Sequence, residues 1–167
     1  MLLTLQLSLA LMLALCLLVY AATALIQDRR LFTTAPKDIQ AAAKDHPPRF
    51  WGARALGWKL AFISVLVMAG AFLYAAHDGI LKGFLFRQHF ARFITMLYLW
   101  KAFDIICLDW LLLTKTHFFQ HFYPETEGCE GYHQFGFNRR EQLARIIIFP
   151  FIAALMAAAA CMIGGSI

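Results

Sequence analysis

Four long apolar stretches, separated by polar segments, dominate the pattern of hydrophobic and polar positions. Residues 1–26, 60–76 and 146–163 contain no charged side chain, and residues 94–113 form a further, mostly apolar stretch. About 20 apolar residues cross the hydrocarbon core of a bilayer as an α-helix. The pattern therefore predicts an all-α membrane protein with a single transmembrane domain, a bundle of about four transmembrane helices. The predicted domain covers residues 1–167, with helices at about 2–26, 58–77, 84–114 and 143–163.

The third stretch is preceded by an alternation of aromatic and basic residues. Such a mixture suits the headgroup region and predicts an interfacial extension of the helix before its membrane-spanning part. The alternating residues are Lys82, Phe84, Phe86, Arg87, His89, Phe90, Arg92 and Phe93.

The first stretch has two interpretations. Ala22-Thr23-Ala24 resembles the small-residue site at which a signal peptide is cleaved. However, no Lys or Arg precedes the stretch, and it exceeds the 7–15 apolar residues of a signal peptide. We therefore favour a retained helix.

Composition and charge agree with a membrane location. Hydrophobic residues make up 61% of the chain and charged residues 15%, well below the roughly 25% of soluble domains. The net charge of +5 is carried by segments between the apolar stretches, where anionic headgroups would meet it. Membrane lipids are therefore the expected partners, rather than nucleic acid.

The distribution of Lys and Arg predicts the orientation, because short basic loops stay in the cytoplasm. Loops one and three carry seven and four basic residues, eleven together, against three between the second and third helices. We therefore expect loops 27–57 and 115–142 to be cytoplasmic and both termini to face outward. The eleven are Arg29, Arg30, Lys37, Lys44, Arg49, Arg54, Lys59, Lys115, Arg139, Arg140 and Arg145.

The third helix is unusual because it carries Lys101, Asp104 and Asp109. At 100° per residue, these side chains occupy one sector of about 140°. A charge facing lipid costs several kcal/mol, so the sector should face protein or water. Two interpretations remain open: an internal pair, Lys101 with Asp104, that only locks the bundle, and a polar intramembrane site for a proton, an ion or a substrate.

The loop after the third helix is rich in His, Glu and aromatic residues. His117 and His121 share a helical face and are a candidate zinc pair, although a pair of surface histidines is the simpler interpretation. Glu127, Tyr132 and His133 follow in a stretch whose glycines and aromatics predict a shaped, interfacial loop. No apolar stretch has a central histidine, so haem is not favoured, and no cofactor is expected.

The last stretch contains Pro150 in its first predicted turns, where a missing N–H does little harm. Small residues recur every four positions at Ala153, Ala157 and Cys161. Such spacing lets helices approach closely in lipid. These residues are a candidate contact surface, either within the chain or between copies as a homo-oligomer.

One set of short motifs is similar to an uncharacterised family of small bacterial multi-pass membrane proteins. In that family a helix ending in Asp-Trp-Leu leads into a Pro-Gly-Thr-Glu-Gly loop; here Glu125 stands in place of the first glycine. The resemblance implies the bacterial inner membrane and no catalytic residue. It suggests that Asp104, Asp109, Glu127 and Tyr132 form one cluster. The motifs are Phe103-Asp104, Leu108-Asp109-Trp110-Leu111-Leu112, Pro124-Glu125-Thr126-Glu127-Gly128, Tyr132 and Gly136-Phe137.

Three functions fit these features. The first is a transporter-like or accessory subunit of the inner membrane, with its polar site on the third helix. The second is a membrane-embedded enzyme that acts on a lipid or quinone at the cytoplasmic interface, with Asp109, His117, His121 and Glu127 as candidate residues. The third is a metal or haem protein of electron transfer. We favour the first, because no set of nucleophile, base and orienting group is visible.

The orientation makes a direct prediction. A reporter that is active only outside the cytoplasm, fused after Ile167, should be active in cells, because an even number of spans returns the chain to the outer side. Activity of a cytoplasm-specific reporter at the same position would contradict this orientation.

Overall fold

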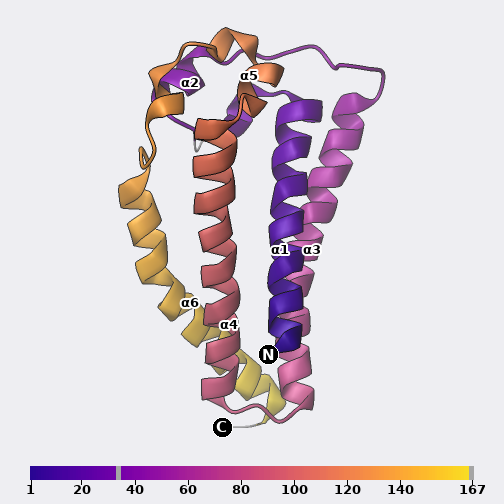
Figure 1. Ribbon diagram of the computed structural model, residues 1–167. Coiled ribbons are helices and arrows are strands. Elements are labelled where there is room, and N and C mark those ends of the chain that lie inside the picture. The colour runs from indigo at the N-terminus through magenta and orange to yellow at the C-terminus, as the bar shows by residue number, and fades with distance from the viewer. Residues whose placement is uncertain (33–34, 166–167) are drawn as a thin grey trace. The chain divides into compact units, whose positions relative to one another are not determined.

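The computed structural model describes residues 1–32 and 35–165 (Figure 1). Thr33 and Thr34 of the first loop, and the last two residues of the expected domain, lie outside this part. Every regular element described is helical, which confirms the predicted all-α class. The elements are α1 (Leu2–Tyr20), η1 (Ala21–Ile26), η2 (Arg29–Phe32), α2 (Lys37–Ala42), α3 (Ala53–Leu81), α4 (Phe86–Phe103), η3 (Asp104–Lys115), α5 (Phe118–Phe122), η4 (Pro124–Thr126), η5 (Glu130–His133) and α6 (Arg139–Gly164).

Three helical segments are long and apolar enough to cross a membrane: Leu2–Ile26, Ala53–Leu81 and Arg139–Gly164. Their large apolar side chains are often exposed; Leu155, for example, is 75% exposed. Hydrocarbon is a suitable solvent for such a surface, whereas water is not. These segments support the prediction that the chain is a membrane protein. The number of four spans depends on α4 and η3, which carry more charge, and stays a prediction.

The chain divides into two compact units. The first consists of Met1–Ala14, Leu66–Ala102 and Arg140–Ile167. Its core combines large residues such as Leu11, Phe93 and Met96 with alanines of α3 and α6. Ala153 and Ala157 are fully buried and Cys161 is 4% exposed, so the small residues of α6 pack within this chain.

Pro150 lies about three turns inside α6, because the helix begins at Arg139 rather than near residue 143. A proline inside a helix leaves the carbonyl four residues earlier without its usual N–H donor. That carbonyl belongs to Ile146, and the Tyr98 hydroxyl of α4 donates to it over 3.3 Å. The Tyr98 and Phe149 rings also pack beside each other, with centroids 6.2 Å apart. A side chain of α4 thus replaces the donor that proline removes.

A buried ion pair joins α3 to α4 within the first unit. The Arg92 guanidinium donates to the Asp78 carboxylate and to the Ala75 carbonyl, each over 2.8 Å. It also lies 4.5 Å from the centre of the Phe84 ring. Arg92 is 6% exposed, so these contacts provide the partners that a charge removed from water requires.

His89 is fully buried beside this ion pair. Its ring lies parallel to Phe93, with centroids 6.0 Å apart, and edge-on to Phe84. A methyl group on Gly79 would come within 2.4 Å of the ring, so α3 needs a glycine here. Both His89 and Arg92 are buried because each packs against α3; the interfacial extension before the third span stays a prediction.

Gly79→Ala should destabilise the protein by about 1–3 kcal/mol, because an overpacked buried ring must shift. Gly70→Ala, in the same helix with open space around it, should stabilise it by about 0.5–1 kcal/mol. Unfolding of both variants in detergent micelles would measure the difference. Equal effects would show that contact with His89 does not determine the residue at position 79.

The second unit consists of Leu15–Val65 and Phe103–Arg139. The two polar segments predicted to be cytoplasmic loops lie in this unit, together with helix ends. Its core includes Leu25, Ile39, Leu113, Phe122 and Tyr123. In Figure 1, α2 and α5 lie in the same layer of short helices. Residues of the first and third loops thus pack against each other within this unit.

Candidate functional site

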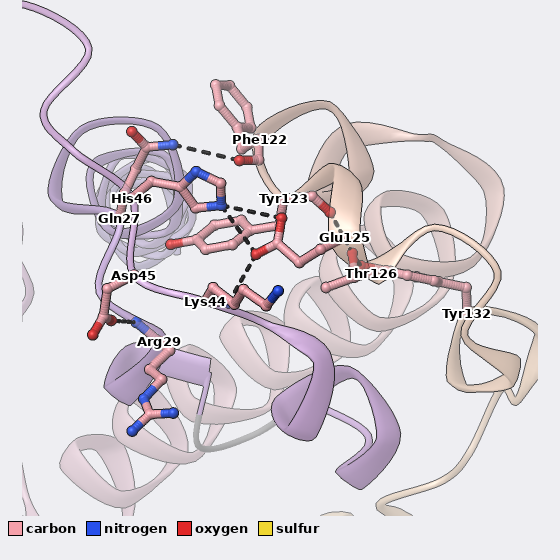
Figure 2. Close-up of polar contacts among 10 residues, drawn as sticks. All are labelled: Gln27, Arg29, Lys44, Asp45, His46, Phe122, Tyr123, Glu125, Thr126 and Tyr132. Atoms are coloured by element: carbon pink, nitrogen blue, oxygen red, sulfur yellow. Dashed lines mark hydrogen bonds and ion pairs between the residues drawn. The ribbon is translucent and has the colours of Figure 1, made fainter.

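Side-chain hydrogen bonds join the two loops of the second unit (Figure 2). The Asp38 carboxylate accepts from the Gly131 N–H over 2.7 Å. The Glu125 carboxylate accepts from the Lys44 N–H over 2.8 Å. Each carboxylate binds a backbone donor of the opposite loop. The two bonds join residues 81 and 93 positions apart in the sequence.

A histidine and a glutamate form the central pair of this contact. The His46 Nε2 atom lies 3.0 and 3.1 Å from the two Glu125 oxygens. Burial opposes ionisation of Glu125, but bonds from its own N–H, from His46 and from the Lys44 N–H outweigh it and lower the pKa of the carboxyl group. The carboxylate is therefore charged at neutral pH. It accepts bonds only, so Nε2 carries a hydrogen and donates.

Two buried tyrosines surround the pair. Tyr123 is fully buried and meets the His46 ring edge-on at 5.3 Å. Its burial, with the nearby charges of Glu125, Asp28 and Asp45, raises the pKa of its hydroxyl group, which stays protonated. Tyr132 shares a 2.7 Å hydrogen bond with the Thr126 hydroxyl. Burial also raises the pKa of Tyr132, partly offset by that bond. Neither phenol is a base at neutral pH.

Gln27 combines burial with a strained backbone. It is 3% exposed and adopts the left-handed conformation, with φ of 53°, which is uncommon for residues other than glycine. Its carbonyl accepts from the His46 N–H over 3.3 Å, and its Nε2 donates to the Phe122 carbonyl over 3.5 Å. Its buried Oε1 has no hydrogen-bond partner among residues 1–32 and 35–165. Strain and an unsatisfied buried acceptor in one residue mark a candidate functional position.

The carboxylates around this site leave the arginines without acidic partners. Asp28 accepts from the Arg30 N–H and Asp45 from the Arg29 N–H, at 2.8 and 2.9 Å. The guanidinium of Arg49 lies 4.8 Å from the centre of the Phe122 ring. Within the part of the chain that the structure describes, Arg29, Arg30 and Arg49 are exposed and form no ion pair. These three guanidinium groups therefore have no acidic partner within the described residues.

The three residues of the predicted intramembrane site belong to two elements that follow each other in sequence, α4 and η3. Lys101, near the end of α4, is 5% exposed. Asp104 and Asp109 belong to η3, a π-helix, and are half-buried. The Asn138 side chain donates to Asp109 over 3.2 Å. π-Helical turns often occur at functional positions.

The loop residues singled out by the sequence are placed separately. Tyr132 is buried, whereas Glu127 and His133 are exposed. The loop does fold onto η3, as the Asn138–Asp109 bond shows. Tyr132, however, uses its hydroxyl for Thr126. The cluster of Asp104, Asp109, Glu127 and Tyr132 stays a prediction.

The predicted metal pair is exposed. His117 and His121 lie at the surface, and the His121 ring contacts Phe122 edge-on at 5.0 Å. Among the residues described, no three or more His, Cys, Asp or Glu side chains form a group suited to a metal ion. The zinc hypothesis therefore depends on these two histidines alone and stays a prediction.

Sequence inspection missed Gln27, His46 and Glu125 as one site. No local spacing connects positions 46 and 125, so only the fold brings them together. The available signal was indirect: His46 precedes Pro47 and Glu125 follows Pro124. Proline restricts its own backbone and that of the residue before it, and so favours a defined loop path.

Comparisons with known proteins leave the resemblance untested. No family model, no curated protein and no solved structure matches the chain.

Glu125→Gln should destabilise the protein near neutral pH by about 1–3 kcal/mol, because a half-buried charged acceptor of the bonds from His46 and the Lys44 N–H is lost. The pKa of Glu125 is lower in the folded state than in the unfolded state. Its contribution to the free energy of unfolding is therefore complete above the unfolded-state pKa of about 4.3, and it disappears as the pH falls through the lower folded-state pKa. The free energies of unfolding of wild type and variant should thus converge in acid. Glu127→Gln, at an exposed position, is the control. A pH-independent difference would contradict this role for Glu125.

Proposed function

We propose that this chain is a small multi-pass protein of the bacterial inner membrane, and that it acts as a transporter-like or accessory subunit. Its polar intramembrane site comprises Lys101, Asp104 and Asp109 on the helix formed by α4 and η3. The observation that carries the proposal is the burial of Lys101, at 5% exposure, in a chain with three other segments able to span a membrane.

The helix that carries these residues is itself a candidate fourth span. The 18 residues of α4 and the 12 of η3 follow one another directly and together make 30. About 20 suffice to cross the hydrocarbon. Ionisable residues reduce its apolar character, yet Arg92 and Lys101 are buried rather than exposed to lipid. A span of this kind is typical of helices that line a polar pathway.

Energetics favour a role beyond locking the bundle. A buried ion pair contributes little net stability, since desolvation offsets the attraction between its charges. Apolar residues would hold helices together at lower cost. The π-helix that begins at Asp104 adds a second irregularity beside Lys101, and such irregularities in helices accompany functional sites. Both features support a site for a proton, an ion or a polar substrate.

Contacts within the second unit support the proposed orientation. Four spans place both loops on one side and both termini on the other. The loops meet through the Asp38–Gly131 and His46–Glu125 contacts. Their excess of basic residues favours the cytoplasm.

Lys101→Met combined with Asp104→Leu tests the proposal, because it removes both charges and retains apolar volume. Proteoliposomes carrying a pH-sensitive dye and an imposed proton gradient would report proton flux. We expect wild-type flux and a decrease of at least about tenfold in the double variant, equivalent to a barrier about 1.4 kcal/mol higher.

Arg87→Met is the matched control, since Arg87 is an exposed residue of the same helix. It should retain wild-type flux. Full flux in the double variant would leave the two charges with a structural role only. No flux in the wild type would contradict the transporter-like function.

A further inference from the structure

We propose that Gln27, His46 and Arg49 form a binding site in the second unit for the headgroup of an anionic phospholipid that has free hydroxyl groups. The chemistry of such a headgroup is a phosphodiester beside hydroxyl donors. The site is distinct from Lys101, Asp104 and Asp109.

The first group of the site is the Gln27 side-chain oxygen. The amide nitrogen already donates to the Phe122 carbonyl, so the oxygen points away from that bond. It is buried and has no donor among the described residues. An unsatisfied buried acceptor costs about 1–3 kcal/mol. A ligand hydroxyl group would remove this cost.

The second group is the other ring nitrogen of His46. Because Nε2 bonds to Glu125, Nδ1 is the ring nitrogen left to meet a ligand. No residue in the described part of the chain donates to Nδ1, and the side chain is 29% exposed. His46 and Gln27 are adjacent through the bond between the His46 N–H and the Gln27 carbonyl. Figure 2 shows their side chains emerging from neighbouring backbone. An amide oxygen and a ring nitrogen side by side match a ligand with hydroxyl groups, which can both donate and accept hydrogen bonds.

The third group is the Arg49 guanidinium. It lies over the ring of Phe122, the residue whose carbonyl binds Gln27. Arg49 is exposed and has no acidic partner in the described chain. A guanidinium binds phosphate oxygens in a bidentate manner. Phe122 thus contacts both Arg49, through its ring, and Gln27, through its carbonyl. The site offers Arg49 for the phosphate, and Gln27 and His46 for the hydroxyl groups.

The surroundings favour a lipid over a soluble phosphate. Phe50 and Trp51 follow Arg49 directly and are 51% and 99% exposed. An aromatic side chain this exposed is unfavourable in water but suits the headgroup region. The same unit contains the start of α3, a segment able to span a membrane. We therefore assign the ligand to the bilayer.

Lipid retention tests this site. The wild-type protein would be purified from detergent containing equal amounts of phosphatidylglycerol and phosphatidylcholine, and bound lipid counted by native mass spectrometry. We expect selective retention of phosphatidylglycerol. Arg49→Met and Gln27→Met should each reduce it about tenfold, the loss of one charge-assisted or buried hydrogen bond. Arg30→Met, an exposed arginine of the same unit, should leave it unchanged.

The outcomes are separable. Equal retention of both lipids by the wild type, or wild-type retention by a folded Arg49→Met, would overturn the proposal. If Gln27→Met unfolds, the difference in lipid retention between Arg49→Met and Arg30→Met decides whether the site binds the headgroup. Displacement of the lipid by millimolar glycerol phosphate, but not by inorganic phosphate, would retain the headgroup chemistry and overturn the assignment to the bilayer. None of these measurements requires proton flux, so this inference and the proposed function fail independently.

Discussion

The need of polar groups in the helices for partners inside the protein shapes this structure, because hydrocarbon supplies neither donors nor acceptors. Some polar groups find a partner within their own helix: the Ser8 and Ser64 hydroxyls each donate to the carbonyl four residues earlier, over 2.9 Å. Larger groups need a second helix, as Arg92 needs Asp78. The carbonyl that Pro150 leaves free is met by Tyr98 in the same way. These contacts join the elements because the alternative is an unsatisfied group in lipid.

In the loops of the second unit, side chains likewise provide hydrogen-bond partners for the backbone. Carboxylates there bind backbone N–H groups rather than arginines, so irregular backbone is satisfied without regular secondary structure. These carboxylates therefore do not pair with Arg29 or Arg30, whose side chains are exposed and form no ion pair within residues 1–32 and 35–165.

Periodicity and apolar length predicted the helical class and the membrane-length segments α1–η1, α3 and α6, because these properties are local and additive. Helix ends were less predictable: α6 begins at Arg139, since charged residues before an apolar stretch still form good helix. The burial of His89 was not predictable, because composition does not reveal that Gly79 provides space for its ring. The site at Gln27, His46 and Glu125 was beyond prediction, since it depends on pairing between residues up to 95 positions apart.

The separation between the two loops also constrains the order of biosynthesis. The first loop emerges from the ribosome well before Phe122, Glu125 and Gly131, the residues that later satisfy Gln27, Lys44 and Asp38. Two helices, α3 and α4, must be made in between. Contacts this distant in sequence form slowly. The nascent chain therefore holds an incomplete, polar first loop until the second half arrives, a period in which a chaperone or the lipid surface has access to it.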